Sequence, residues 1–287
     1  MLILCTSYTK QSRNSVEIKN TLTRAASAGF SYIHWCNEFG GSSYIYSVYE
    51  MLQIKDWCRE LGLSVKGVHA ADGEKNSDLK NYLSTNEYNR LAGLYLLKNR
   101  IDLAHILNTD AIVLHFKFPW ERIEQDNDCI DVLLQLAFRT FDELEGYCKT
   151  RGVKICIENT SGIPAECNPI FDTLFKRYDS GYMEFCFDTG HAVLNCKGNY
   201  LEYAQRYYDR LFYVHLHDNL GDRDNHILPF EGNFDWEGFA QLLARSSRDY
   251  SLVIESSIKG EADSIQWLKE AFNTGNRFIE MVEKHRS

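Results

Sequence analysis

Eight short apolar segments recur along the 287-residue chain, and each is followed by a longer segment of helical character. The short segments are rich in β-branched and aromatic residues and are Leu2–Thr6, Tyr32–Cys36, Val65–His69, Ala111–His115, Lys154–Glu158, Glu184–Asp188, Phe212–His217 and Leu252–Glu255. Apolar residues recur every three or four positions in segments that include Ile45–Leu61, Tyr88–Leu107, Asp131–Cys148 and Asp263–Lys284. Continuous apolar strands that alternate with helices predict a parallel sheet buried on both faces.

The number of these units selects one α/β architecture over another. Eight strand–helix units in a chain of this length match a closed (β/α)8 TIM barrel, and we expect one such domain over residues 1–287. The alternative is an open doubly wound sheet, which normally carries a glycine-rich turn after its first strand. Residues Cys5–Lys10 contain no glycine, so the barrel is the favoured interpretation.

Composition excludes several other classes of protein. Hydrophobic residues make up 44% of the chain, which is too many for intrinsic disorder. No apolar run reaches the roughly 18 residues of a membrane span, and the N-terminus lacks the pattern of a signal peptide. The nine cysteines are odd in number and form no C-x-x-C pair, which indicates buried, reduced thiols. We therefore expect a cytoplasmic protein without a membrane partner.

The charge balance argues against a nucleic-acid partner. The chain has 31 Lys and Arg against 40 Asp and Glu, a formal net charge of −9. A globally acidic surface repels the phosphate backbone, although it does not exclude a local basic groove.

Ionisable residues cluster where the predicted strands end, and this is the strongest functional signal in the chain. Six of the nine histidines lie at or just after these ends. The residues concerned are His69, His115, Glu158, Asp188, His191, His215, His217, Asp224, His226 and Glu255. In a (β/α)8 barrel the carboxyl ends of all strands meet at one mouth, so we expect these side chains to converge.

Convergence of so many donors predicts a divalent metal site. A single polar residue at a strand end is usually a hydrogen-bonded structural group, and Glu158 or Glu255 alone would suggest a buried ion pair. On neither strand does a lysine or arginine lie within three residues of the glutamate. Charged carboxylates in a low-dielectric mouth repel each other unless a cation neutralises them. Imidazoles and carboxylates suit Zn²⁺, Mn²⁺, Fe²⁺ or Co²⁺, and carboxylates also suit Mg²⁺.

Three motifs give the chain a family resemblance. They are IENTSG at 157–162, FDTGHA at 187–192 and HLHDNLGDRDNHILPFEGNFDW at 215–236. The sequence resembles the xylose-isomerase-like TIM barrel superfamily, which groups sugar and sugar-phosphate isomerases and epimerases with endonuclease IV. The chain departs from the family pattern at Phe230, where relatives often carry glycine, and this leaves the shape of that loop open.

The resemblance implies roles for individual residues. It makes Glu158, Asp188, His215 and Glu255 the main metal ligands, with His217 as the alternative to His215 because side chains two apart on a strand share a face. Endonuclease IV-like relatives bind further zinc ions, and the matching positions are His69, His115, His191, Asp224 and His226. The resemblance therefore implies a centre of one to three metal ions and allows a homo-oligomer.

The leading hypothesis is an isomerase or epimerase of a sugar or sugar phosphate. Proton transfer would pass through a metal-stabilised enediolate, with Glu158 and Glu255 as the acid–base pair. We expect the substrate to be held by His191 or His217 and lined by Asn159, which would also orient Glu158. Aromatic walls are expected from Trp35, Phe116 and Trp120, and a substrate phosphate would need cations such as Lys117, Arg223 or Lys259.

Two other functions remain open at this stage. One is metal-dependent phosphodiester hydrolysis at abasic DNA, as in endonuclease IV, which the complete set of ligand types favours. Against it, the loops after the second and third strands contribute only Lys75 among cations, beside Glu38, Asp72 and Glu74. The other is a barrel that binds a sugar without catalysis, although the presence of both Glu158 and Glu255 does not favour it.

Overall fold

The computed structural model describes residues 1–9, 14–36, 43–71, 73, 78–116, 129–160, 168–196, 198–258 and 264–286. Eight parallel strands form a closed barrel in which each strand pairs with the next along the chain and β8 closes on β1. The strands are β1 (Leu2–Cys5), β2 (Tyr32–Trp35), β3 (Ser64–His69), β4 (Ala111–His115), β5 (Lys154–Glu158), β6 (Met183–Asp188), β7 (Leu211–Leu216) and β8 (Ser251–Ile254). The predicted (β/α)8 fold is confirmed.

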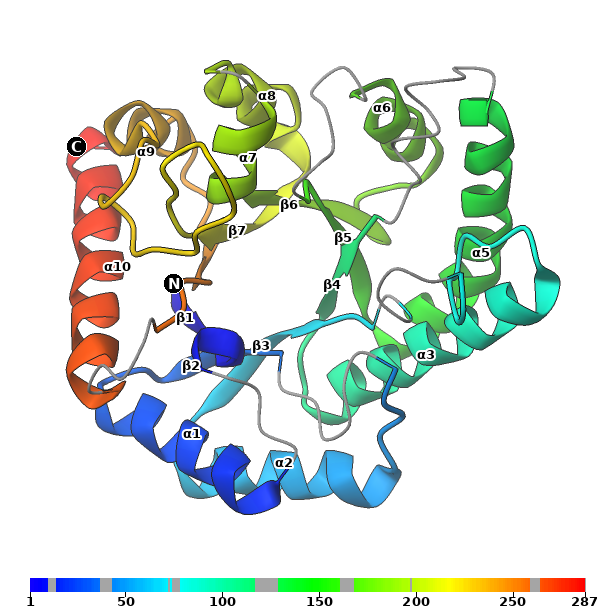
Figure 1. Ribbon diagram of the computed structural model, residues 1–287, viewed down its shortest axis with the longest axis horizontal. Helices are drawn as coiled ribbons and strands as arrows, with labels where there is room; N and C mark the ends of the chain where they lie inside the picture. Colours follow the sequence, from blue (N-terminus) through cyan, green and yellow to red (C-terminus); the bar gives the residue numbers. More distant parts are fainter. Residues whose placement is uncertain are drawn as a thin grey trace.

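Helices surround the barrel as an outer ring (Figure 1). They are α1 (Ser15–Ser27), α2 (Val48–Glu60), α3 (Glu87–Ile106), α5 (Cys129–Arg151), α6 (Asn168–Arg177), α7 (Thr189–Asn195), α8 (Tyr200–Arg206), α9 (Trp236–Ala244) and α10 (Ser264–Arg286), with 3₁₀ turns η1 (Thr6–Tyr8) and η3 (Tyr208–Arg210). Ser47 caps α2 through a reciprocal capping box with Glu50, which explains why this helix begins after the predicted start at Ile45.

Strand alternation divides the side chains into two cores. Ile155 and Ile157 of β5 belong to the large core between the barrel and the helices. A second cluster contains Ile3, Val113, Cys156, Tyr213 and Val253, which come from five different strands and fill the barrel. Because successive residues of a strand face opposite sides, the residues of β5 that face the barrel are Lys154, Cys156 and Glu158.

The strand register sets the polar ends of the strands at one height. His115 of β4 lies opposite Glu158 of β5, and Asp188 of β6 lies opposite His215 of β7. Parallel pairing therefore brings side chains that are 100 residues apart in sequence to the same end of the barrel.

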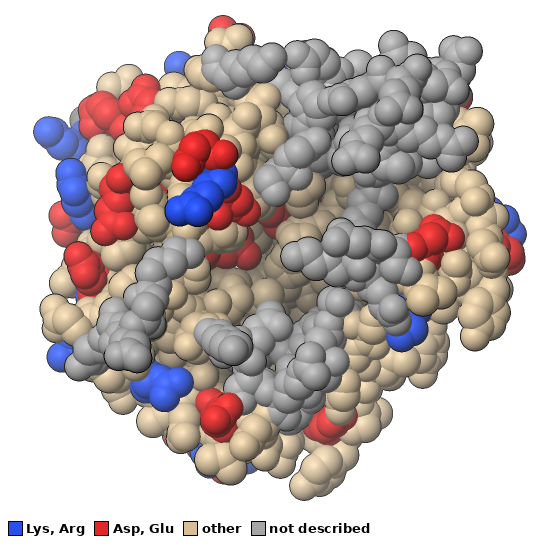
Figure 2. All heavy atoms as spheres, viewed as in Figure 1, with Lys and Arg blue, Asp and Glu red and all other residues tan. Residues whose placement is uncertain are grey.

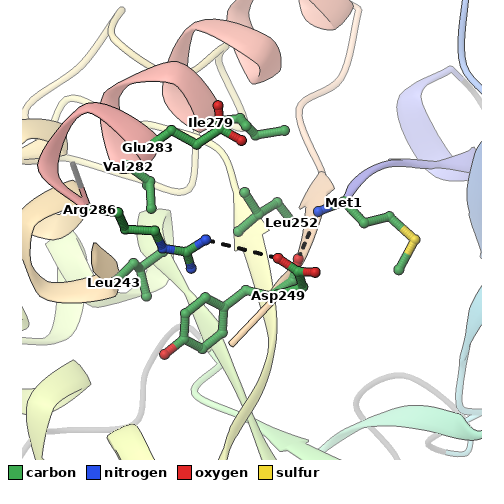
Figure 3. A pocket seen from close by; sticks show the side chains of 9 residues that line it. Met1, Leu243, Asp249, Leu252, Ile279, Val282, Glu283 and Arg286 are labelled. Atoms are coloured by element: carbon green, nitrogen blue, oxygen red, sulfur yellow. Dashed lines mark hydrogen bonds and ion pairs between the residues drawn. The ribbon is translucent and has the colours of Figure 1, made fainter. Parts of the chain in front are cut away.

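The first residue and the last helix meet the start of β8 at the opposite end of the barrel from the polar strand ends. The Met1 ammonium donates to the Tyr250 carbonyl (3.1 Å), and Arg286 of α10 lies 3.9 Å from Asp249. A cavity of about 60 Å³ lies beside these residues (Figure 3). It is smaller than the several hundred Å³ typical of a ligand pocket, so this cavity is not the candidate site.

Two further expectations concern cysteines and membranes. Seven cysteines with described side chains are free thiols, and all of them except the half-buried Cys36 are buried. The side chains of Cys129 and Cys167 lie outside the described residues. In the described part of the chain, no helix combines the length and the apolar character that crossing a bilayer requires.

Candidate metal centre

Four buried donors meet at the carboxyl end of the barrel. They are Glu158 at the end of β5, Asp188 at the end of β6, His215 on β7 and Glu255 directly after β8. One donor atom from each lies within 4.8 Å of the others. The Nδ1 atom of His215 lies 2.5 Å from Glu255 Oε2, 3.3 Å from Glu158 Oε2 and 3.8 Å from Asp188 Oδ2. A single cation placed among these atoms would contact all four residues.

The polar atoms of this group are poorly satisfied by the protein itself. Both Glu158 oxygens, both His215 nitrogens and Glu255 Oε2 are buried without a well-formed hydrogen bond among the described residues. The ion pairs that the described residues make with these carboxylates all involve histidines. Buried charges without strong partners are destabilising, so the donor set fits a divalent cation.

Asp188 is held by the two elements that meet at it. Its backbone N–H donates to Asn159 Oδ1 (2.8 Å), and the Asn159 amide donates back to the Asp188 carbonyl (2.9 Å). Asp188 also caps α7, because its Oδ1 accepts the backbone N–H of His191 (2.7 Å). The carboxylate is therefore fixed by both strand pairing and helix capping.

A second donor group shares Glu158 with the first. The Nε2 atoms of His69 and His115 lie 3.1 Å apart, and they lie 3.9 Å and 3.5 Å from Glu158 Oε2. His69 directs Nδ1 at the carbonyl of Ala70 (3.2 Å), which leaves Nε2 facing this group. A ring nitrogen tied to a carbonyl is a common arrangement behind a metal-ligating histidine.

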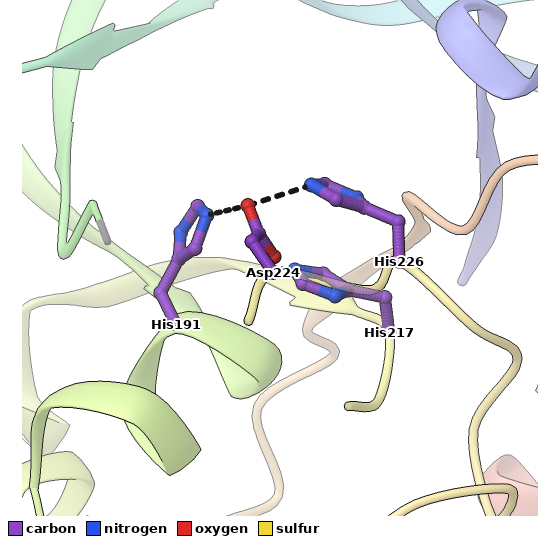
Figure 4. A group of neighbouring side chains, drawn as sticks. All are labelled: His191, His217, Asp224 and His226. Atoms are coloured by element: carbon purple, nitrogen blue, oxygen red, sulfur yellow. Dashed lines mark hydrogen bonds and ion pairs between the residues drawn. The ribbon is translucent and has the colours of Figure 1, made fainter. Parts of the chain in front are cut away.

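A third donor group lies beside the first and contains His191, His217, Asp224 and His226 (Figure 4). The Nε2 atoms of His191 and His226 point at Asp224 Oδ2 from either side, at 3.2 Å and 3.1 Å. His226 Nδ1 faces the carbonyl of Glu255 (2.8 Å), and the residue has a left-handed φ of 47°. Strained backbone of this kind is concentrated at functional sites.

The electrostatics of the centre follow from carboxylates and imidazoles that share one buried space. Burial alone would raise the pKa of Glu158, but His115 and His215 hold that pKa well below its usual range. Burial alone would lower the pKa of His226, but its hydrogen bond to Asp224 raises the pKa to about 9. A bound cation would replace the protons on such imidazoles, because only the neutral ring is a ligand.

The surface at this end of the barrel is hollowed at its centre. Figure 2 shows the hollow, with acidic side chains and a smaller basic group on the side of the segment between β7 and α9. The exposed residues of that segment include Asp222, Arg223, Asp224 and Glu231. The exposed residues of this segment therefore carry more negative than positive charge.

The structure does not support the expected roles of three residues. Both groups of the Asn159 amide bond the backbone of Asp188, so its described hydrogen bonds are with β6 and not with Glu158. Trp35 points away from the barrel, because His34 takes the inward position beside it. Its indole N–H donates to the Tyr46 hydroxyl (3.1 Å) within the outer core. Phe116 is likewise fully buried in that core.

The remaining predicted contacts divide between described and undescribed segments. Arg223 is exposed at the rim, and His191 lies within the site, with Nδ1 3.1 Å from Glu158 Oε1. His215 and His217 both face the site, but only His215 belongs to the group around Glu255. Lys117 and Trp120 lie outside the described residues, as do Lys75 and Lys259.

Sequence reasoning missed two residues that build the site. The Thr189 hydroxyl donates to the carbonyls of His215 (3.0 Å) and His217 (2.7 Å), which ties β6 to β7. Asp218 is fully buried and accepts the Trp236 indole N–H (2.8 Å), which holds the loop after β7. Both residues lie inside the quoted motifs, so the motifs themselves were the available signal.

The loop around Phe230 keeps a glycine-like backbone without a glycine. Phe230 has a φ of 74°, a conformation that costs a residue with a Cβ about 1 kcal/mol. Its ring packs on Trp236 (5.3 Å between centroids) and beneath the Arg277 guanidinium (3.9 Å). These contacts offset the strain. The loop therefore has the left-handed conformation that glycine would adopt, although residue 230 is phenylalanine.

Comparison with known proteins agrees with the fold and identifies a family. The model of a protein family described as "Xylose isomerase-like TIM barrel" matches residues 22–271. Protein y4fM of Sinorhizobium fredii is 35% identical over 257 residues, which cover 83% of this chain and 81% of that protein. Protein MJ1311 of Methanocaldococcus jannaschii is 28% identical over 215 residues, which cover 72% of this chain and 71% of that protein.

Solved structures show the same fold at low sequence identity. A D-tagatose 3-epimerase-like protein has a TM-score of 0.77 at 22% identity, covering 100% of this chain and 99% of its own. D-psicose 3-epimerase in the presence of D-fructose has a TM-score of 0.71 at 15% identity, covering 98% and 99%. A putative xylose isomerase from Rhodospirillum rubrum has a TM-score of 0.74 at 15% identity, covering 97% of each chain.

Proposed function

Because the chain belongs to the xylose isomerase-like TIM barrel family, we propose that it is a divalent-metal-dependent isomerase or epimerase of a sugar or sugar phosphate. The observation that carries the proposal is the pair of buried carboxylates, Glu158 and Glu255, which lie 3.3 Å and 2.5 Å from His215 Nδ1. The epimerases among the structural neighbours act on sugars, which supports the substrate class.

The reaction class follows from what two carboxylates in one buried space can do. The C–H next to a sugar carbonyl is a weak acid, and its removal needs a base in contact with that hydrogen. Glu158 and Glu255 come from β5 and from the end of β8, so they approach the site from different strands. One carboxylate would remove the proton and the other would return it, and each positioned group contributes about 10²–10⁴ in rate.

A divalent cation held by Glu158, Asp188, His215 and Glu255 would supply Lewis acidity that stabilises negative charge on the substrate oxygens. His191, whose Nδ1 lies beside Glu158, would hold a substrate oxygen when it is not itself a ligand. The imidazole and carboxylate donors suit Mn²⁺, Zn²⁺, Co²⁺ or Fe²⁺, and the three adjacent donor groups have room for one to three ions.

The experiment is solvent-deuterium uptake into a panel of ketoses and ketose phosphates with Mn²⁺-loaded protein. Wild type should exchange one carbon-bound hydrogen of its substrate, and Glu158→Gln and Glu255→Gln should lower that rate at least 100-fold. Glu184→Gln is the matched control, because Glu184 also faces the barrel interior but lies at its opposite end. Unchanged exchange in both site variants would remove the two carboxylates from catalysis.

A second candidate function is metal-dependent hydrolysis of a phosphodiester, including abasic DNA. The observation in its favour is that the groups around His69 and Asp224 adjoin the first group, as a multi-metal hydrolase requires. The excess of exposed acidic residues in the segment between β7 and α9 disfavours a DNA backbone there. Metal-dependent nicking of an abasic duplex at physiological salt would support this candidate. Sugar binding without hydrogen exchange would instead indicate a third function, a non-catalytic sugar-binding barrel.

A further inference from the structure

The imidazole of His217 is fully buried directly after β7 and faces the carboxylate of Asp188. Its Nε2 atom lies 2.8 Å from Asp188 Oδ1 and 2.9 Å from Oδ2, so it approaches both oxygens at once. No other ring nitrogen among the described residues comes this close to either oxygen of Asp188. The contact is therefore the main side-chain interaction of this carboxylate.

The ring of His217 is packed between neighbours, and its backbone is hydrogen-bonded. It stacks on His226 at 4.0 Å between centroids and 8° between planes. On another side it lies against Gly190, where a Cβ would come within 2.0 Å of Cε1 and 2.3 Å of Nδ1. The His217 backbone N–H donates to the Thr189 hydroxyl (3.2 Å). Only glycine at position 190 leaves room for the ring in this orientation.

The surroundings of the ring nitrogen that faces the site distinguish a ligand from a supporting residue. His215 Nδ1 lies within 3.8 Å of carboxylate oxygens from three different residues, as an atom at a shared cation site does. His217 Nε2 instead lies within hydrogen-bond distance of both oxygens of one carboxylate, that of Asp188. Its Nδ1 is buried without a hydrogen-bond partner among the described residues, so His217 lacks the carbonyl contact that stands behind the rings of His69 and His226.

We propose that His217 is a positioning residue, which donates from Nε2 to Asp188 and fixes the direction in which that carboxylate meets the metal. The proposal rests on the proposed function only in taking Asp188 as a ligand. It removes His217 from the third donor group, which then consists of His191, Asp224 and His226. It also assigns a purpose to Gly190 of the FDTGHA motif, namely to admit the His217 ring beside Asp188.

The test compares His217→Phe, which removes the donor, with His217→Gln, which keeps an N–H donor at similar reach. The readouts are the dissociation constant for Co²⁺ or Mn²⁺ by calorimetry, the number of ions per chain at saturation, and the visible spectrum of bound Co²⁺. His217→Phe should weaken the first ion roughly 10- to 100-fold, keep the number of ions and alter the Co²⁺ spectrum. His217→Gln should restore affinity to within about threefold of wild type.

Three results would overturn the proposal. Loss of a whole ion per chain in His217→Phe would make the residue a ligand. Unchanged affinity and an unchanged spectrum would remove it from the site. A His217→Gln protein as weak as His217→Phe would reduce the ring to packing alone. If His217→Phe does not fold, Gly190→Ala supplies the same comparison, because it displaces the ring while His217 remains.

The readout is independent of the sugar reaction. A wild-type protein that binds metal but exchanges no sugar hydrogen would contradict the proposed function and leave the His217 comparison intact. If wild type exchanges sugar hydrogen but the His217 variants bind metal as tightly as wild type, the proposed function stands and the role of His217 is contradicted.

Discussion

Asn159 and Asp188 are joined by a pair of hydrogen bonds that involve only the side chain of the first and the backbone of the second. The two bonds run in opposite directions, at 2.8 Å and 2.9 Å, between the ends of β5 and β6. Asn159 is 2% exposed, so water does not compete for either bond. The amide thus continues the strand pairing by one residue at the point where β6 turns into α7.

Replacing Asn159 with alanine tests this relationship. The variant would leave a buried N–H and a buried C=O without partners, and we expect the free energy of unfolding to fall by roughly 2 kcal/mol or more. Chemical denaturation measures the loss. Asn276→Ala is the control, because that amide bonds only a carbonyl of its own helix, α10, and should change stability by less than about 0.5 kcal/mol. Equal stability of both variants would contradict the role of Asn159.

The hydroxyl of Thr189 should contribute more to the stability of the fold than its methyl group does. Thr189→Val keeps the shape but leaves the buried N–H of His217 without an acceptor, and we expect a loss of about 1–3 kcal/mol in unfolding free energy. Thr189→Ser keeps the hydroxyl and should lie close to wild type. A valine variant as stable as the serine variant would show that the hydrogen bonds between β6 and β7 are dispensable.

Because of Glu184, the free energy of unfolding should fall as the pH rises. Burial raises the pKa of Glu184, and Lys154, 3.7 Å away, only partly opposes it. A carboxyl with a raised pKa in the folded state favours the protonated form. The destabilisation caused by its buried charge is therefore absent below the ordinary glutamate pKa and complete above the pKa of Glu184 in the folded state. Glu184→Gln should match wild type in acid and be about 1 kcal/mol more stable at pH 7.

The matched variant for Glu184 is Lys154→Met, which removes the strongest cationic partner and leaves the buried charge with the weaker effects of Arg210 and Arg248. It should be less stable than wild type at pH 7 and should approach wild type as the pH falls. The measurement is urea denaturation across pH 4–8. A Glu184→Gln protein that is less stable than wild type at neutral pH would contradict the sign of this effect.

Removing divalent metal should lower the melting temperature. The donor groups are assembled only in the folded chain, so an ion bound there stabilises the fold by mass action, about 2.7 kcal/mol at 100 times its dissociation constant. Chelator-treated protein should melt several degrees lower and recover on addition of Mn²⁺, as scanning calorimetry would measure. Identical melting temperatures with and without saturating metal would count against the site.

The order of the elements followed directly from the chain because each strand is a continuous apolar run. The strands β4 and β5 have the predicted bounds, Ala111–His115 and Lys154–Glu158, and β6 ends at the predicted Asp188. Buried parallel strands leave this signal because both faces need apolar side chains, and polar residues return only at the mouth. The convergence of Glu158, Asp188, His215 and Glu255 was predictable for the same reason.

The partners of individual side chains were less predictable. Alternation could have placed Trp35 outside the barrel once His34 was taken as inward, since neighbours on a strand face opposite sides. No sequence pattern indicated that Asn159 binds a backbone on the next strand, or that His217 faces Asp188. Those contacts depend on the register between β5, β6 and β7, which only the assembled barrel fixes.

The central claim is that Glu158, Asp188, His215 and Glu255 hold one cation between them. The most direct measurement is anomalous diffraction from crystals of the protein saturated with Mn²⁺. We predict a strong peak at about 2.0–2.2 Å from a donor atom of each of these four residues. A folded protein in saturating Mn²⁺ with no peak among the four side chains, or with the three carboxylates turned away from one another, would contradict the account.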